Sequence, residues 1–256
     1  MDMPNSFCRV SRDGRGVVRL TICNAGTLNI LGSAAIIGIQ AALQSLAADD
    51  GIRALVLAGD SEKSMIGGAD IKEMATLDQA SAEAFISRLA GLCEAVRNFP
   101  APVIARMPGW CLGGGLEVAA ACDLRVAGHD AKFGMPEVRV GIPSVIHAAL
   151  LPRLIGWGRT RWLLMTAEMI DAPTALAWGL VDAVAAEGEL DRAVEKVVES
   201  LLACGPEALR AQKALLRQWE DLPLEDSIEV SITAFGRAFL TDEPKRLMQH
   251  FIDRKR

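Results

Sequence analysis

Three consecutive glycines followed by a glutamate are the first feature of this sequence that points to chemistry. Gly113, Gly114 and Gly115 stand in the segment CLGGGLEVAAACD, between a predicted strand and a predicted helix. The first N–H groups of a helix have no partner within the helix, and glycine lets a ligand approach them without a Cβ in the way. Such a junction suits an anion, or an oxygen that becomes anionic during a reaction. Close packing of strand on helix explains the glycines alone equally well.

Glu117 adds a carboxylate to this junction. It lies in a run of residues that otherwise belongs in a core, where an unpaired charge is unfavourable unless it has a partner or a task. It follows Gly114 by three residues, so the two share a face of the first helical turn. Compensation of the helix dipole is the alternative explanation.

Two further segments strengthen the functional interpretation. SMIGGADIKEM follows a predicted strand and leads towards a helix, so Gly67, Gly68 and Ala69 offer another free N–H. Two backbone donors from different loops that converge on one oxygen form an oxyanion hole. AKFGMPEVRVGIP supplies Glu137, after a Gly and a Pro, in a loop or at a strand edge.

The elements that position these residues alternate between strands and helices. Apolar, β-branched segments predict strands, and apolar residues at three- and four-residue spacing predict helices. The strands are expected at residues 16–23, 53–60, 102–109 and 123–128, and the helices at residues 33–50, with Ser33 as N-cap, and 79–99. This rhythm predicts an α/β layer arrangement with buried parallel strands.

The character of the chain changes after about residue 190, and only helices are predicted beyond it. They are expected at residues 189–205, 206–221, 224–240 and 242–254. Ile228, Ile232, Phe235 and Phe239 recur at three- and four-residue steps, which indicates an apolar stripe on one helix. We therefore divide the chain into an α/β core at 1–190 and a helical region at 191–256.

Composition excludes several classes of protein. The 256 residues are 51% hydrophobic, and the formal net charge of −5 argues against nucleic acid as a partner. No apolar run is long enough to span a membrane, and the first residues resemble neither a signal nor a transit peptide. Six cysteines and three histidines show no metal-binding spacing. We expect a cytoplasmic protein with reduced thiols and no metal.

The segments GGADIKEM, GWCLGGGLEVAAACDLRVA and KFGMPEVRVGIP together resemble the enoyl-CoA hydratase/isomerase (crotonase) family, and most closely its enoyl-CoA hydratases. The resemblance extends over nearly the whole chain, including RLIGWGR and AWGLVDAV. It implies a spiral of repeated ββα units. It also implies C-terminal helices that build homotrimers, often paired into homohexamers.

The resemblance also implies a substrate and a site. The substrate is an acyl-CoA of fatty acid metabolism, and no cofactor is needed because coenzyme A is part of it. The N–H groups of Ala69 and Gly114 bind the thioester oxygen, Glu117 acts as a base toward water, and Glu137 delivers a proton to the α-carbon. The residues implied to contact substrate or coenzyme A are Gly68, Ala69, Asp70, Ile71, Lys72, Gly113 and Gly114. For Asp70, capping of the following helix is an equally good interpretation.

The sequence departs from the family after Glu137. VGIPSVIHAALLPRLIG is one residue shorter before its proline, has Ser144 where a glycine is common, and lacks the glycine pair that usually follows. Ser144 and His147 raise the alternative of a serine hydrolase, but no G-x-S-x-G segment accompanies them. We expect His147 to be a packed, hydrogen-bonded residue.

The sequence is therefore compatible with three functions. Hydration of an enoyl-CoA uses both glutamates, whereas the family's 3,2-enoyl-CoA isomerases generally lack a glutamate at the position of Glu117. Other enolate-forming reactions of the same fold are the related alternative. A non-catalytic acyl-CoA- or RNA-binding member is the alternative of a different class. The presence of both Glu117 and Glu137 favours hydration.

Overall fold

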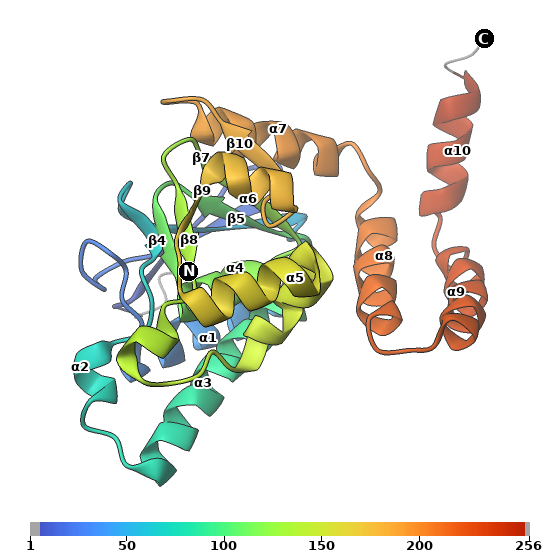
Figure 1. Cartoon of the computed structure of the whole chain (residues 1–256). Helices are drawn as coiled ribbons and strands as arrows, with labels where there is room; N and C mark the ends of the chain where they lie inside the picture. Colours follow the sequence, from blue (N-terminus) through green and yellow to red (C-terminus); the bar gives the residue numbers. More distant parts are fainter. Residues whose placement is uncertain (1–5, 254–256) are drawn as a thin grey trace.

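Two β-sheets form the centre of the molecule (Figure 1). The computed structural model describes residues 6–253. The larger sheet has the order β1 (Cys8–Arg12), β2 (Val17–Ile22), β3 (Ala54–Gly59), β5 (Val103–Met107), β7 (Leu124–Gly128) and β10 (Ala183–Ala185). The smaller sheet has the order β4 (Ser64–Ile66), β6 (Trp110–Leu112), β8 (Lys132–Gly134) and β9 (Ile170–Asp171). All neighbours are parallel except the pairs β1–β2 and β8–β9.

From β3 to β8, consecutive strands join the larger and the smaller sheet alternately. In each of the pairs β3–β4, β5–β6 and β7–β8, the first strand joins the larger sheet and the second joins the smaller one, and helical segments follow. These segments are α2 (Ile71–Met74) and α3 (Gln79–Arg97), then α4 (Gly114–Ala121), then the 3-10 turns η1 (Glu137–Val140) and η2 (Ile146–Leu150) with α5 (Leu151–Thr166). The spiral of ββα units that the resemblance implied is therefore confirmed.

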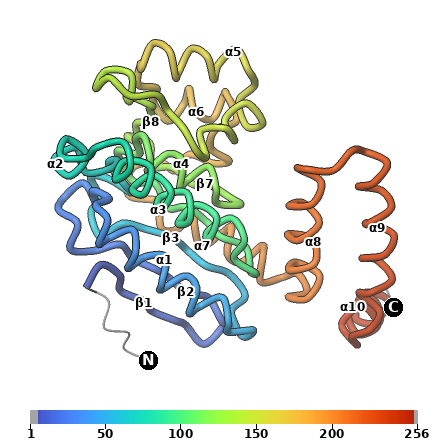
Figure 2. The backbone as a smooth tube through the Cα atoms, turned by 90° about the horizontal axis from the view of Figure 1, so that it is seen from below, coloured from blue at the N-terminus to red at the C-terminus, as the bar shows by residue number. Residues whose placement is uncertain are grey.

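Helices cover both faces of the larger sheet, which explains its continuous apolar strands. Every residue of β3 and of β5 is buried. Figure 2 shows α1 (Ser33–Ala47) beside α3, and their apolar residues join the main core. The opposite face packs against α7 (Leu190–Leu202) through Val194 and Val198. Parallel strands covered on both faces need apolar residues at every position, not at alternate ones.

Ser33 does not cap the helix that it was predicted to cap. Gly32 is the N-cap of α1 and makes no side-chain hydrogen bond. Instead, the backbone N–H of Ser33 donates to Oε2 of Glu73 at 2.8 Å, and its hydroxyl donates to the same carboxylate. The N-cap prediction is wrong because a carboxylate from the α2 segment, 40 residues away, satisfies the start of the helix.

The C-terminal region is helical as predicted. α6 (Ala172–Trp178) and α7 still belong to the core, and α8 (Pro206–Trp219), α9 (Leu224–Ala238) and α10 (Glu243–Asp253) stand beyond it (Figure 1). Lys213 of α8 ties this region to the core by an ion pair of 2.6 Å with Asp123, which follows α4. Within residues 6–253, no helix combines the length and hydropathy that a membrane crossing requires. The boundary at residue 190 and an assembly role for this region remain predictions.

Candidate active site

A cavity of about 120 Å³ brings the predicted glycine loops and both predicted glutamates together. Apolar side chains form most of its wall. Of the residues that line it, only Glu117 and Glu137 are ionisable. The lining residues are Gly67, Gly68, Ala69, Ile71, Met74, Phe85, Ile86, Leu89, Leu112, Gly113, Gly114, Glu117, Pro136, Glu137, Val140, Ile142, Pro143 and Val145.

Two backbone N–H groups on the wall of this cavity are unused. Among residues 6–253, neither the N–H of Ala69 nor that of Gly114 donates a hydrogen bond to another group of the protein. Each follows a glycine with a positive φ, +125° at Gly68 and +53° at Gly113. Only glycine adopts such angles without strain, so the two donors depend on these glycines for their orientation.

A Cβ would meet a different group at each of the three consecutive glycines. A Cβ on Gly113 would lie 2.4 Å from Oε1 of Glu137, and one on Gly114 would lie 2.7 Å from Cδ2 of Leu89. A Cβ on Gly115 would lie 2.3 Å from the backbone oxygen of Ile66 in β4. The first two glycines thus leave room within the site, and the third allows α4 to pack against the smaller sheet. The packing interpretation therefore holds at Gly115, and the binding of an oxygen at Gly113 and Gly114 remains a prediction.

Glu117 lies in the first turn of α4 with a side chain that is only 4% exposed. Its Oε1 accepts a hydrogen bond of 3.1 Å from the backbone N–H of Ala148 in η2. Burial raises the pKa of Glu117 to about 8; the Ala148 N–H opposes this rise and the charge of Glu137 adds to it. A carboxyl group with such a pKa exchanges protons near neutral pH, as acid–base catalysis requires.

Glu137 begins η1, lines the same cavity and is half-buried. Its Oε2 accepts a hydrogen bond of 2.9 Å from the hydroxyl of Ser144. Burial raises the pKa of Glu137, whereas a backbone hydrogen bond and the Ser144 hydroxyl lower it. The two carboxyl groups therefore face one apolar space with different partners.

Asp70 and Lys72 do not line the cavity. The carboxylate of Asp70 caps α2, accepting from the backbone N–H of Lys72 at 2.8 Å and of Glu73 at 3.3 Å. Lys72 projects from the exposed side of α2, and Ile71 lines the mouth of the cavity with 60% of its surface exposed. The capping interpretation of Asp70 holds, and contacts of Asp70 and Lys72 with coenzyme A remain predictions.

Residues 144–148 donate hydrogen bonds to both glutamates. The sequence did not reveal these contacts. Ser144 and Ala148 bind Glu137 and Glu117, while Nε2 of His147 lies 2.8 Å from Oε1 of Glu94 in α3. Ser144 and His147 thus have separate partners and form no catalytic triad, and His147 is the hydrogen-bonded residue that we expected. The departure from the family pattern at Ser144 was the one signal that could have pointed here.

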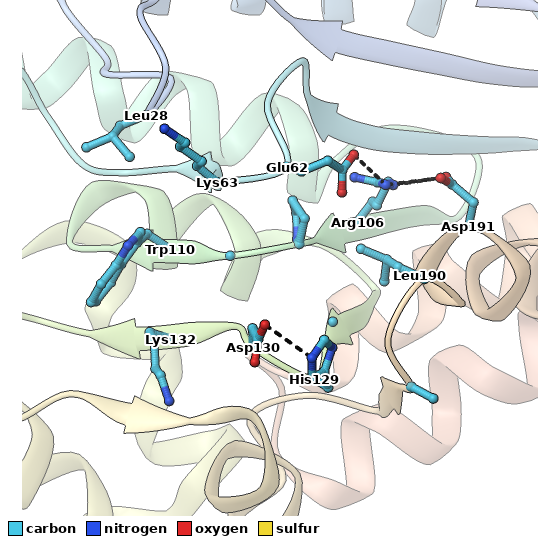
Figure 3. Close-up of a pocket in the computed structure, with 15 residues that line it drawn as sticks. Leu28, Glu62, Lys63, Arg106, Trp110, His129, Asp130, Lys132, Leu190 and Asp191 are labelled. Carbon is cyan, nitrogen blue, oxygen red and sulfur yellow. Dashed lines mark hydrogen bonds and ion pairs between the residues drawn. The ribbon is translucent and has the colours of Figure 1, made fainter.

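A second, larger cavity of about 720 Å³ shares no lining residue with the first (Figure 3). Its carboxylates are engaged with basic groups: Arg106 bridges Glu62 at 2.8 Å and Asp191 at 2.9 Å, and His129 lies 3.1 Å from Asp130. Glu117 and Glu137, in contrast, share a cavity that no cationic side chain of residues 6–253 lines. The smaller cavity is therefore the candidate active site.

Comparison with known proteins places this geometry in a family. Residues 12–256 match the family model described as enoyl-CoA hydratase/isomerase. The chain belongs to this family, and it is an enzyme. It is 34% identical to a crotonyl-CoA hydratase of Syntrophomonas wolfei over 90% of this chain and 88% of that one. It is 31% identical to a short-chain-enoyl-CoA hydratase of Clostridium acetobutylicum, over 96% of this chain and 95% of the relative.

A solved structure of this enoyl-CoA hydratase/isomerase family agrees with the fold. The crystal structure of an enoyl-CoA hydratase from Mycobacterium smegmatis superimposes with a TM-score of 0.93 at 30% sequence identity. The alignment covers 97% of this chain and 96% of that one. The likeness therefore includes the core, the cavity elements and the C-terminal helices.

Proposed function

We propose that this enzyme is an enoyl-CoA hydratase, which adds water reversibly across the 2,3 double bond of an enoyl-CoA thioester. The observation that carries this proposal is the pair Glu117 and Glu137, which face one apolar cavity beside two unused backbone N–H groups. The hydratase names of the relatives at 31% and 34% identity support the same reaction.

In this proposal each group has a task. The N–H groups of Ala69 and Gly114 bind the thioester oxygen and stabilise the negative charge that it gains as water adds to the β-carbon. One glutamate accepts a proton from the water, and the other delivers a proton to the α-carbon. The pair must therefore carry one proton at the start, which two carboxyl groups in an apolar cavity favour.

The cavity wall indicates the class of acyl chain. Phe85 and Leu89 of α3 form its buried end, and Val140 and Ile142 lie near the surface at 53% and 41% exposure. Since no cationic side chain in the described part of the chain lines the cavity, we propose uncharged enoyl chains as substrates. Coenzyme A itself would extend past Ile71 toward Lys72, and no further cofactor is required.

We also propose that the protein is cytoplasmic and that its C-terminal helices assemble it into trimers or hexamers. Three residues of α9 and its C-cap residue present apolar side chains to the surface: Ile228, Ile232, Phe235 and Phe239. An apolar stripe of this kind is typical of an interface between protein chains. Neither nucleic acid nor a membrane is part of the proposal.

An isomerase or another enolate-forming enzyme of the family is the alternative. Movement of a double bond from the 3 to the 2 position requires a proton to leave one carbon and return to another, which one carboxylate performs. Glu117 lines the same cavity as Glu137 and has a backbone donor of its own, which favours a reaction that uses two carboxyl groups.

The deciding experiment supplies purified enzyme with crotonyl-CoA, with longer enoyl-CoAs and with branched enoyl-CoAs. Loss of the absorbance of the conjugated thioester measures hydration, and a 3-enoyl-CoA is tested in parallel. Hydration of at least one enoyl-CoA is expected. Conversion of the 3-enoyl-CoA without hydration would identify an isomerase, and binding of the thioesters without turnover would identify a non-catalytic protein.

A further inference from the structure

His147 stands between a strained residue and the backbone donor of Glu117. Ala148, which follows it, donates the hydrogen bond of 3.1 Å to Glu117, and Ile146, which precedes it, has a φ of +40°. A β-branched residue disfavours this left-handed region, whereas glycine adopts it without strain. A strained turn persists only where other contacts hold it. The start of η2 therefore needs an anchor that a glycine would not need.

The side chain of His147 provides such a contact. It is 11% exposed, and its Nε2 lies 2.8 Å from Oε1 of Glu94 in α3. Nδ1 is buried and has no hydrogen-bond partner among residues 6–253. Since a buried N–H without a partner is unfavourable, the ring proton belongs on Nε2, which donates it to the carboxylate. A directed hydrogen bond thus ties η2 to α3.

Glu94 is itself held in place. The side-chain amide of Asn98 donates to its Oε2 at 2.8 Å, and Nη1 of Arg97 lies 3.3 Å from its Oε1. Burial raises the pKa of Glu94, but the hydrogen bond from His147 and these two neighbours lower it by more. Arg97 in turn binds the carboxylate of Glu220, the C-cap residue of α8. The acceptor for His147 is therefore an ionised carboxylate that several donors fix.

We infer that His147 and Glu94 are a pair of positioning residues for the proposed reaction. Their hydrogen bond holds the strained turn at Ile146, and this turn keeps the N–H of Ala148 directed at Glu117. Neither member of the pair lines the cavity, so the pair touches no substrate and acts only through η2. The inference rests on the proposed hydration and goes beyond it, because it names residues outside the cavity that set the geometry of a carboxyl group inside it.

Steady-state kinetics with an enoyl-CoA that the wild type hydrates test the pair. His147→Ala should lower kcat by about tenfold or more with little change in KM, because a small displacement of a reacting group slows the chemical step. Glu94→Ala removes the same hydrogen bond from α3 and should give the same loss. His147→Gln places an amide N–H near the position of Nε2 and should recover most of the activity. Wild-type kcat in both alanine variants would overturn the inference.

A second histidine–carboxylate pair provides the matched control. His129 lies 3.1 Å from Asp130 at the larger cavity, which shares no lining residue with the active site. His129→Ala should change neither kcat nor KM. A loss of kcat equal to that of His147→Ala would show a general effect of removing a histidine and would overturn the inference.

Relief of the strain at Ile146 tests whether the pair acts through the turn. Ile146→Gly lets this turn adopt its positive φ without strain, so the turn no longer depends on the anchor. In this background, the loss of kcat caused by His147→Ala should be smaller by about threefold or more. The same loss in both backgrounds would overturn the inference.

A titration that needs no turnover gives an independent decision. The glutamate side-chain carboxyl groups are labelled with ¹³C, and Glu117→Gln and Glu137→Gln assign the two signals of the cavity. Burial raises the pKa of Glu117 to about 8, and the Ala148 N–H opposes this rise. Loss of that donor in His147→Ala should therefore move the midpoint of Glu117 upward by about half a pH unit or more, and that of Glu137 by less.

The outcomes of the titration separate the inference from the proposed function. An unchanged midpoint of Glu117 in His147→Ala, with the fold intact by circular dichroism, would overturn the inference. Absence of hydration by the wild-type enzyme would overturn the proposed function instead, and the titration would still decide whether the pair directs the Ala148 N–H at Glu117.

Discussion

The carboxylate of Glu137 lies so close to Gly113 that a Cβ on the glycine would approach Oε1 to 2.4 Å. Gly113→Ala should therefore displace Glu137 and lower kcat for hydration by about 10² or more, the usual scale for a positioned acid–base group. It also introduces a side chain at a φ of +53°. Steady-state kinetics and the thermal unfolding midpoint measure the two effects.

A matched control separates displacement of Glu137 from backbone strain. Gly141 has a φ of +83°, but no atom lies within 4 Å of the position that a Cβ would take. Gly141→Ala should destabilise the fold by about 1 kcal/mol, the cost of a side chain in the left-handed region, with little change in kcat. Equal losses of kcat in the two variants would contradict the proposed contact.

Substitutions of Gly114 test whether its N–H acts as an oxyanion donor. Gly114→Pro lacks the N–H, and proline is well tolerated at the first position of a helix such as α4. One lost oxyanion donor lowers kcat by about 10² to 10³. Gly114→Ala adds a Cβ that meets the same Leu89 side chain but keeps the N–H, so its loss should be much smaller. If alanine and proline were equally damaging, the glycine would serve packing only.

The two glutamates should behave as a unit in hydration. Glu117→Gln and Glu137→Gln keep the size of the side chain, and each should lower kcat by about 10² or more. The double variant should lose far less than the product of the two single losses, because neither residue completes the reaction alone. Full hydration by Glu117→Gln would remove that residue from the proposed mechanism.

Stability should fall at alkaline pH because of Glu117. Burial raises its pKa from 4.5 to about 8, so the folded protein favours the protonated form. The stabilisation from that form is complete below pH 4.5 and is lost as the pH rises through about 8. The unfolding midpoint of the wild type should therefore decrease between pH 5 and pH 9 more steeply than that of Glu117→Gln. If the unfolding midpoints of the two proteins changed in parallel with pH, ionisation of Glu117 would not destabilise the folded protein.

The apolar stripe of α9 predicts an assembly of several chains. Ile232 and Phe235 are 71% and 70% exposed on a helix that packs mainly against α8. Light scattering at micromolar concentration should show a trimer or a hexamer, and Ile232→Asp should dissociate it. Glu229→Asp, on the same helix but outside the stripe, should leave the assembly intact. A wild-type monomer would contradict the prediction.

Local patterns predicted the elements and the glycine loops well. The continuous apolar segment at Ala54–Gly59 became a fully buried parallel strand, and the long amphipathic segment became α3. Glu117 was recognised because a carboxylate in an apolar run is conspicuous without any knowledge of the fold. These features depend on residues that are close together in the sequence, so they can be predicted from the sequence alone.

Contacts between distant segments could not be predicted in this way. Ser33 matched the pattern of an N-cap, but Glu73 binds it from another helix. The hydrogen bond from Ala148 to Glu117 joins residues that are 31 positions apart. Ile146, two residues before Ala148 in η2, adopts a φ of +40° where the family pattern has a glycine, although a β-branched residue disfavours that region. Only the assembled fold sets such contacts.

The alternation of strands between the two sheets has a consequence for how the chain folds. β3 must pair with β5 in the larger sheet, yet β4 and the helices α2 and α3 lie between them in sequence, and β4 pairs with β6 in the smaller sheet. Beyond β3 the two sheets therefore grow together, and every parallel pairing must close a loop that contains other elements. The spiral is expected to fold slowly and in one cooperative step, and a chain shortened within it would leave two unpaired sheet edges where aggregation begins.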